Sequence, residues 1–461
     1  MDYQLIVIGA GPGGYAAALH AAKLGMKVAV VENRQAGGTC LNRGCVPTKT
    51  LLHSSQIYHD IHTGAHAGVT ADGIQVDMNA IFAHKRAVSE KLSSGIEGMF
   101  KSAKIDLLRG TGTILGTGRV SVTDGDGTKE YTCEHILAAT GSVPARPPIP
   151  GLSLPQVLTS DELLEGCDHL YRSIVIIGGG VIGVEFATFY NDLGCEVTII
   201  EGMDRLLPTM DRELGQNLAQ ILKKRGVKLH LNSMVQNVES TAEGAGAVNF
   251  VTKDVPGRAE GEVVLCAIGR RPYLEGLFAP DCQPEMNGKS IRVDEQYRTS
   301  IPGVYAIGDV SSRIQLAHVA SAQGTACVEL LCGVENHVNQ SVVPSCIYSR
   351  PEIAVVGLTD AECKTQGIPA KAGKCTLFGN AKTVIMEGDR AFMKVVAHAE
   401  SHRLLGAQLM CEHATDMISQ LAQAIANEMT AEQLLAAMRP HPTFEECLSE
   451  ALEDLVEKLN K

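Results

Sequence analysis

The chain has 461 residues, of which 45% are hydrophobic and 20% are charged, an ordinary composition for a globular protein. This length exceeds what one hydrophobic core supports, so about three or four domains are expected. The formal net charge of −12 argues against a nucleic-acid partner, because binding to phosphates requires a basic surface.

The sequence favours a cytoplasmic chain that is neither exported nor inserted in a membrane. It opens on the strand-like run Leu5 to Ile8, and Asp2 stands where a secretory signal carries a basic residue. No run of residues is long and apolar enough to predict a membrane span. Most of the 14 cysteines are therefore expected to be reduced, and a disulfide that does form is expected to serve catalysis.

Two stretches of the chain repeat one another, and each predicts a strand, a glycine turn, a helix and a second strand. They read LIVIGAGPGGYAAALHAAKLGMKVAVVE and IVIIGGGVIGVEFATFYNDLGCEVTIIE. The G-x-G-x-x-G glycines are Gly9, Gly11 and Gly14 in the first and Gly178, Gly180 and Gly183 in the second. An acid lies 23 positions after the first glycine in both copies, Glu32 and Glu201.

This pattern is typical of dinucleotide binding. The first glycine permits a tight turn, the second lets backbone amides approach a pyrophosphate, and the third allows close helix packing. The acid accepts hydrogen bonds from a ribose. A single motif can be a glycine turn without a ligand, but two copies in the same strand and helix context predict two dinucleotide-binding units.

The rest of the chain predicts further elements around these units. Residues 56–101 read as mostly helical, residues 136–141 as a short buried strand, and the proline-rich residues 143–151 as a linker. Another strand leads to Asp309. From residue 342 strands precede expected helices at 416–427, 431–438 and 444–459. The predicted fold is α/β, with two Rossmann-like dinucleotide-binding domains and a C-terminal α+β domain.

Cys40 and Cys45 follow the first repeat directly, in GGTCLNRGCVPTK. Five positions apart on a regular helix, two cysteines face different directions and cannot bond. A distorted turn is required, and Gly44 and Pro47 permit one. Two ordinary buried thiols or two zinc ligands are alternatives, but zinc requires further cysteines or histidines at close spacing and none follows. The position beside a dinucleotide unit favours a redox pair.

At this point the sequence resembles the pyridine nucleotide-disulfide oxidoreductases, and among them the dihydrolipoamide dehydrogenases, over essentially its whole length. The motifs that carry the resemblance are GAGPGGY, GGTCLNRGCVPTK, ATGS, GGGVIGVEFA, AIGRRP, VYAIGDV, LAH, YSRPEIAVVG and HPTFEE. The resemblance implies an FAD-binding domain (1–145), an NAD-binding domain (146–268), a central domain that completes the FAD site (269–340) and a dimer interface domain (341–461).

The resemblance also implies two sets of cofactor ligands. For FAD these are Gly9, Gly11, Gly14, Glu32, Thr39, Lys49, Thr140, Gly141 and Asp309. For NAD they are Gly178, Gly180, Gly183, Glu185, Glu201 and Gly269. Lys49 is expected near the flavin N5, paired with Glu185. Without the resemblance, a plain surface ion pair is the better interpretation of these two residues.

In the same way, Cys40 resembles the thiol that exchanges with substrate sulfur, and Cys45 the thiol that lies against the flavin. His441 resembles the catalytic base, oriented by Glu446, and is expected to reach the active site of the other subunit of a homodimer. The implied reaction oxidises dihydrolipoamide to lipoamide and reduces NAD. The lipoyl group is expected on a separate protein of a 2-oxoacid dehydrogenase or glycine cleavage type complex.

Several features bear on other interpretations. Glu201 favours NAD over NADP, although Arg205 is a cation nearby. Val319 and Glu445 differ from the residues that many relatives carry. The histidines His59, His62 and His66 are spaced loosely like metal ligands, but a solvated helix end is the better interpretation. Another disulfide reductase of the family and a non-catalytic flavoprotein subunit are the remaining alternatives.

Overall fold

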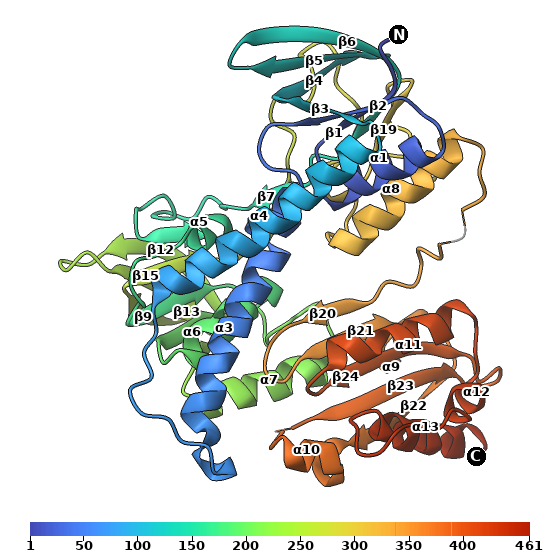
Figure 1. Ribbon diagram of the computed structural model, residues 1–461. Helices are drawn as coiled ribbons and strands as arrows, with labels where there is room; N and C mark the ends of the chain where they lie inside the picture. Colours follow the sequence, from blue (N-terminus) through green and yellow to red (C-terminus); the bar gives the residue numbers. More distant parts are fainter. Residues whose placement is uncertain (337, 389) are drawn as a thin grey trace.

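The computed structural model describes residues 1–336, 338–388 and 390–461. Two α/β units, each with a parallel sheet, are followed by a C-terminal unit in which helices cover an antiparallel sheet (Figure 1). The predicted fold class is therefore confirmed.

The first sheet is built on the first sequence repeat. Its central strand β1 (Tyr3–Ile8) pairs in parallel with β2 (Val28–Glu32) and β6 (Gly127–Ala138). β2 is buried throughout, as expected of a parallel strand that is covered on both faces. The other elements of this region are α1 (Pro12–Lys23), β3 (Asp106–Arg109), β4 (Thr111–Gly116) and β5 (Arg119–Asp124).

A segment from much later in the chain completes the first unit. The strand β19 (Val304–Ala306) pairs in parallel with β6, and α8 (Ala317–Leu331) packs against α1. The helices approach closely because Gly324 has no side chain: a Cβ there would lie 2.4 Å from the carbonyl oxygen of Gly13. The short helix η2 (Gly308–Val310) stands between β19 and α8 and carries Asp309.

The second sheet repeats this construction. Its strands follow the order β11-β10-β9-β15-β8, all parallel, and α6 (Val181–Asp192) connects β9 to β10. The sheet and its helices comprise β8 (Val157–Thr159), α5 (Ser160–Glu165), β9 (Ser173–Ile177), β10 (Glu196–Ile200), α7 (Arg212–Lys224), β11 (Lys228–His230) and β15 (Val263–Cys266). Smaller antiparallel sheets accompany the parallel ones. β12 (Ser233–Ser240), β13 (Gly246–Thr252) and β14 (Val255–Gly261) form one, β7 (Ser142–Pro144) pairs with β16 (Arg270–Pro272), and β17 (Met286–Asn287) pairs with β18 (Ser290–Ile291).

The glycine turns of the two units match each other. Gly9 and Gly178 adopt φ values of +106° and +109°, a region that favours glycine. A Cβ on Gly14 would lie 1.8 Å from the carbonyl oxygen of Gly9, and one on Gly183 would lie 2.0 Å from that of Gly178. The first and third glycines therefore have the turning and packing roles that the sequence predicts.

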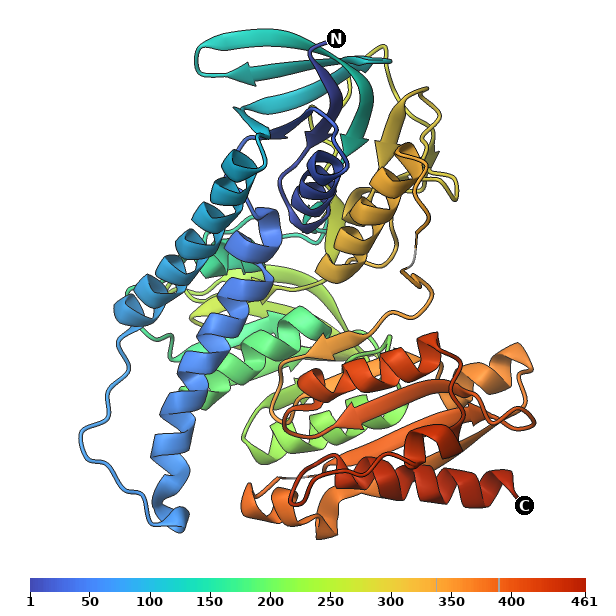
Figure 2. The same cartoon turned by 45° about the vertical axis from the view of Figure 1, so that its right-hand side comes forward.

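Two long helices run beside the parallel sheets (Figure 2). They are α3 (Cys45–Thr63) and α4 (Met78–Ser102), which pack against each other. The side chain of Asp77 caps α4 by accepting a hydrogen bond from the Ala80 amide at 3.1 Å. The prediction of a mostly helical segment is confirmed. The shorter helices α2 (Gly38–Arg43) and η1 (Gly64–Ala67) flank α3.

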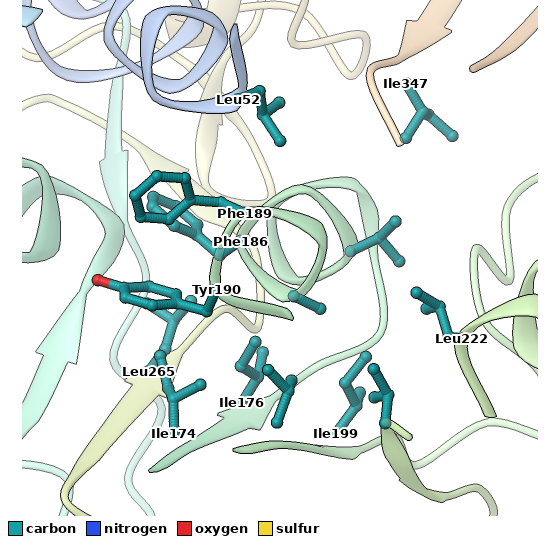
Figure 3. Close-up of a cluster of buried hydrophobic side chains, with 14 of the residues drawn as sticks. Leu52, Ile174, Ile176, Phe186, Phe189, Tyr190, Ile199, Leu222, Leu265 and Ile347 are labelled. Atoms are coloured by element: carbon teal, nitrogen blue, oxygen red, sulfur yellow. The ribbon is translucent and has the colours of Figure 1, made fainter. Parts of the chain in front are cut away.

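The largest hydrophobic cluster surrounds α6 (Figure 3). Phe186, Phe189 and Tyr190 of this helix are almost fully buried. Leu52 of α3 and Ile347 of the C-terminal unit belong to the same cluster. Aromatic side chains bury large apolar areas, so this cluster fixes α6, and with it Glu185, against two other parts of the chain.

The C-terminal unit is an antiparallel sheet in the order β20-β21-β24-β23-β22. Its elements are β20 (Ser345–Ile347), β21 (Ile353–Gly357), α9 (Asp360–Gln366), β22 (Ala370–Thr376), η3 (Leu377–Gly379), α10 (Ala381–Ile385), β23 (Phe392–His398), β24 (Leu404–Met410), α11 (Ala414–Ala426), α12 (Ala431–Leu435) and α13 (Glu446–Leu459). All three predicted helices are present, but α12 ends three residues before its predicted end, Met438. Pro440 disfavours helical backbone at Arg439, which limits the helix to the residues before it.

Among the described residues, no helix combines the length and the apolar character needed to cross a lipid bilayer.

Candidate active site

A cavity of about 1390 Å³ lies where the two parallel units meet, and residues of both sequence repeats line it. The predicted site residues that line it are Gly9, Gly11, Glu32, Thr39, Cys40, Cys45, Lys49, Thr140, Gly141, Gly178, Gly180, Glu185, Glu201, Gly269 and Asp309. Gly14 and Gly183 do not belong to this lining, since both pack against the first glycine of their turn. His441 and Glu446 also lie outside it.

Cys40 and Cys45 are brought together by a break between two helices. α2 ends at Arg43, Gly44 has the non-helical angles φ −152° and ψ −111°, and α3 begins at Cys45. Pro47 lies in the first turn of α3. Proline has no backbone N–H, and N–H groups in the first turn of a helix have no acceptor within the helix, so no hydrogen bond is lost. The distorted turn that the spacing required is therefore present, and it brings Cys40 and Cys45 close enough for each thiol to perturb the protonation of the other.

The two thiols of this pair differ in their electrostatics. The hydrogen bond from Cys40, opposed by burial and assisted by the charge of Lys49, lowers the pKa of Cys45 to about 7. The same hydrogen bond, together with burial, raises the pKa of Cys40. A thiolate on Cys45 and a thiol on Cys40 are thus the favoured protonation states of the reduced pair near neutral pH.

Lys49 and Glu185 form a bidentate ion pair that faces the cavity. Lys49 Nζ donates to Glu185 Oε1 at 2.9 Å and to Oε2 at 2.8 Å. The amide of Tyr348 also donates to Glu185 at 3.1 Å, and the ring of Tyr348 lies 4.7 Å from Lys49 Nζ. Only 4% of the Glu185 side chain is exposed, against 31% of Lys49, so this is a partly buried pair rather than the surface pair that residue patterns alone suggested.

Asp309 belongs to a polar network that the sequence did not reveal. Ser142 Oγ donates to Asp309 at 2.6 Å, and Arg270 Nε donates to Ser142 Oγ at 2.9 Å. Arg270 also lies 3.6 Å from Asp161. Burial raises the pKa of Asp309, and the hydrogen bond from Ser142 opposes this rise. Ser142 lies in the ATGS motif and Arg270 in the AIGRRP motif. The sequence therefore marked both residues, but it did not show that they contact each other.

Glu32 and Glu201 occupy equivalent positions at the ends of β2 and β10. Glu32 accepts hydrogen bonds from the amides of Ala10 and Arg34, both at 2.8 Å. Glu201 accepts them from Gly179 at 2.6 Å and Met203 at 2.7 Å. In each unit the acid is held against the glycine turn by backbone groups, with its carboxylate at the cavity, where a ribose hydroxyl can donate to it.

The second glycine of each turn leaves room for a ligand. A Cβ built on Gly180 would meet no atom within 4 Å, and one on Gly11 would meet only Gly38, at 3.9 Å. Each glycine is the N-cap of a helix of 12 residues, α1 or α6. Both turns therefore fit the pyrophosphate of a dinucleotide.

Arg205, the cation near Glu201, is not among the residues that line the cavity. It donates to Asp204 at 2.8 Å and to the carbonyl of Pro208 at 2.9 Å. The cavity lining next to Glu201 consists instead of Gly202 and Met203. The arrangement offers no cation to a 2′-phosphate at this position, which favours NAD over NADP.

His441 and Glu446 contact each other at the surface of the C-terminal unit. Glu446 accepts a hydrogen bond from His441 Nδ1 at 2.7 Å, and 72% of the histidine side chain is exposed. This bond leaves Nε2 available to accept a proton. Glu445, the departure from many relatives, accepts a hydrogen bond from Gln420 at 2.8 Å. Within one chain the histidine does not line the cavity with Cys40.

The three histidines of the α3 region do not gather around one point. His59 lies 3.6 Å from Asp192, His66 lies 3.1 Å from Glu387, and His62 stacks on Tyr58.

Val319, the other residue that differs from many relatives, is buried in α8.

The chain matches two family models. Residues 3–324 match the pyridine nucleotide-disulphide oxidoreductase model, and residues 343–452 match the dimerisation domain of the same family. A dihydrolipoyl dehydrogenase of Bacillus subtilis is 37% identical over 98% of this chain and 97% of its own length. A mitochondrial dihydrolipoyl dehydrogenase of Arabidopsis thaliana is 35% identical over 98% of this chain and 90% of its own length.

Solved structures agree in fold over almost the whole chain. LpdA from Mycobacterium tuberculosis has a TM-score of 0.89 at 27% identity, over 98% of this chain and 99% of its own. The HOCl-induced flavoprotein disulfide reductase RclA from Escherichia coli has a TM-score of 0.85 at 27% identity, over 99% of both chains. The chain belongs to the pyridine nucleotide-disulfide oxidoreductases. Proteins of this family use FAD and NAD, so the cofactor prediction is confirmed at this level.

Proposed function

We propose that the chain is a dihydrolipoyl dehydrogenase, which oxidises a dihydrolipoyl group to its cyclic disulfide and reduces NAD. One observation carries the proposal: two thiols in contact face a cavity that the glycine turns of two dinucleotide units share. The named dihydrolipoyl dehydrogenases at 33–37% identity along 98% of the chain support this substrate class.

FAD and NAD fit the two halves of the cavity. Gly9, Gly11, Glu32, Thr39, Lys49, Thr140, Gly141 and Asp309 would hold FAD, while Gly178, Gly180, Glu185, Glu201 and Gly269 would hold NAD. When bound, FAD supplies an acceptor for two electrons and a route for hydride transfer to NAD. With these assignments we divide the chain into FAD-binding, NAD-binding, central and interface domains at residues 145, 268 and 340.

The chemistry of the chain itself is thiol–disulfide exchange. In the oxidised enzyme, a substrate thiolate attacks the sulfur of Cys40, the bond between Cys40 and Cys45 breaks, and Cys45 leaves as a thiolate. The second substrate thiolate then attacks the mixed disulfide, which closes the lipoyl ring and releases Cys40. The lowered pKa of Cys45 makes it the better leaving group of the pair.

A base must take the protons of the substrate thiols, and the partner subunit's His441 is proposed for this role. The exposed position of His441, outside the cavity of its own chain, supports action across a homodimer interface. The dimerisation domain at residues 343–452 supports the same assembly. Glu446 orients the ring by accepting the hydrogen bond from His441 Nδ1.

The lipoyl group is proposed to reach the site on a separate protein of a 2-oxoacid dehydrogenase or glycine cleavage type complex. The names of the relatives support the lipoyl chemistry of this partner. The alternative within the family is a reductase that acts on another disulfide; RclA is named as a flavoprotein disulfide reductase.

The test is a direct comparison of substrates on the purified, FAD-loaded enzyme. Dihydrolipoamide with NAD is expected to give NADH at a kcat/KM at least about 100-fold above that for glutathione with NADP, since Glu201 repels a 2′-phosphate. A preference for glutathione and NADP, or for an unrelated disulfide with NADPH, would overturn the proposal.

A further inference from the structure

A second pair of cysteines lies in the C-terminal unit, far from the cavity. Cys375 is on β22, and Cys447 and Glu450 are on α13. Cys375 Sγ donates to Glu450 Oε2 at 3.0 Å, and one ligand atom from each of the three residues lies within 4.8 Å of the others. We call these three residues the C-terminal cluster. In the sequence Cys447 stands alone, without another cysteine nearby.

The cluster is formed by close packing of a helix on a strand. α13 lies against β22 and β23 (Figure 1), and Gly373 of β22 allows the approach. A Cβ on Gly373 would lie 2.2 Å from the carbonyl oxygen of Ala451. Cys447 and Glu450 are three residues apart on α13, so they share one helix face and both point toward β22.

The cluster joins a buried end to a solvent-facing end. Cys375 is 7% exposed and Cys447 is 1% exposed, so neither sulfur is at the open surface. Glu450 is exposed and reaches the sulfurs from outside. A small ion can therefore reach the cluster along the Glu450 side chain, whereas a bulky substrate cannot reach the sulfurs.

The three groups have a chemistry that differs from ordinary core packing. The hydrogen bond with Cys447, then burial, then the hydrogen bond to Glu450 raise the pKa of Cys375. Two thiols and a carboxylate held this closely cannot all be ionised without a cation. A pair that only forms a disulfide has no need of a carboxylate, whereas sulfur and oxygen ligands together suit a borderline-soft cation such as zinc.

We propose that Cys375, Cys447 and Glu450 bind a thiophilic divalent cation, with Zn²⁺ as the probe and water as the fourth ligand. On binding, each thiol releases one proton, and Zn²⁺ with two thiolates and one carboxylate carries a net charge of −1. In the described part of the chain, no other group of three histidine, cysteine or acidic side chains converges in this way. The site would anchor the first turn of α13, which carries Glu446.

The experiment uses the FAD-loaded dimer with Cys40→Ser and Cys45→Ser, so that the redox pair cannot bind the metal. This parent protein is reduced, stripped with a chelator and dialysed against buffered Zn²⁺. It is expected to retain about one zinc ion per chain, and Co²⁺ in its place is expected to show thiolate-to-cobalt absorption.

In this parent, Cys447→Ser is expected to weaken zinc binding by at least about 100-fold and Glu450→Gln by about 10-fold. Glu450 is exposed, so its variant tests the site even where a buried cysteine variant fails to fold. Cys363→Ser, which alters another buried thiol on α9, is the matched control and is expected to bind as the parent does. Absence of zinc from the parent, or equal zinc binding in Glu450→Gln and Cys363→Ser, would overturn the proposal.

Discussion

The molecule contains two pairs of cysteines in contact, and they have opposite electrostatic surroundings. Cys45 opens onto the cavity with the ammonium of Lys49 nearby, which favours a thiolate. Cys375 is buried and donates to the carboxylate of Glu450, which favours a thiol. The same two-sulfur arrangement therefore suits exchange chemistry in one place and cation binding in the other, because the neighbouring charge has opposite sign.

The largest expected effect separates the two pairs by activity. Cys45→Ser should lower NADH formation from dihydrolipoamide by at least about 1000-fold, because a hydroxyl cannot form the disulfide. The long-wavelength absorption of the reduced enzyme, which arises between the Cys45 thiolate and the flavin, should vanish as well. The exposed Cys332 lies outside the cavity lining, so Cys332→Ser should retain full turnover. Turnover in Cys45→Ser equal to this control would remove the first pair from the mechanism.

The redox pair was readable from sequence and the C-terminal cluster was not, for a physical reason. Cys40, Gly44 and Cys45 are close in the chain, so their spacing alone demanded a distorted turn. Cys375 and Glu450 are 75 residues apart, and only the packing of α13 on β22 brings them together. A contact of that kind has no local pattern.

The residues of the cavity also divide into those that the sequence predicted and those whose contacts only the fold shows. The glycine turns and their acids were predicted residue by residue, because a fixed spacing encodes a local strand–turn–helix unit. Lys49 and Glu185 are 136 residues apart, and their pairing came only from the resemblance. Ser142 and Arg270 lie in recognised motifs, but their contact spans 128 residues and was missed. The position of His441 outside the cavity of its own chain was expected only from the resemblance.

The second prediction concerns the base that only the first pair needs. His441→Gln should lower turnover by about 100-fold or more, because proton transfer by a positioned histidine contributes that much. The loss of rate in His441→Gln should be largest in the step in which the dithiol attacks the disulfide. This step is measured as the rate of enzyme reduction in a stopped-flow experiment. Unchanged reduction kinetics would exclude His441 as the base.

Mixed dimers distinguish action across the interface from action within one chain. Co-expression of Cys45→Ser with His441→Gln produces dimers in which one site has both an intact pair and an intact histidine from the other chain. About a quarter of the parental activity should then return, the fraction of intact sites under random pairing. If His441 served its own chain, no mixed dimer would contain an intact site and no activity would return.

A smaller effect comes from removing the cation beside the first pair. The pKa of Cys45 is lowered, so its thiolate is present above about pH 7 and is lost as the pH falls through that value. Lys49→Met should move this transition upward by about one pH unit, followed through the long-wavelength absorption of the reduced enzyme. Lys49→Arg keeps the charge and should titrate close to the parent. A transition at the same pH in Lys49→Met would exclude Lys49 as a cause.

The smallest effect on activity is expected at the second pair of cysteines, Cys375 and Cys447. Cys375→Ser should leave dihydrolipoamide turnover within about twofold of the parent, because Cys375 belongs neither to the cavity lining nor to the hydrogen-bonded pair of His441 and Glu446. Its consequence should be thermal instead. In the Cys40→Ser, Cys45→Ser background, Zn²⁺ at about 100 times its Kd should raise the Tm by a few degrees. Cys375→Ser should abolish this increase, whereas an equal increase in both proteins would place the stabilising zinc elsewhere.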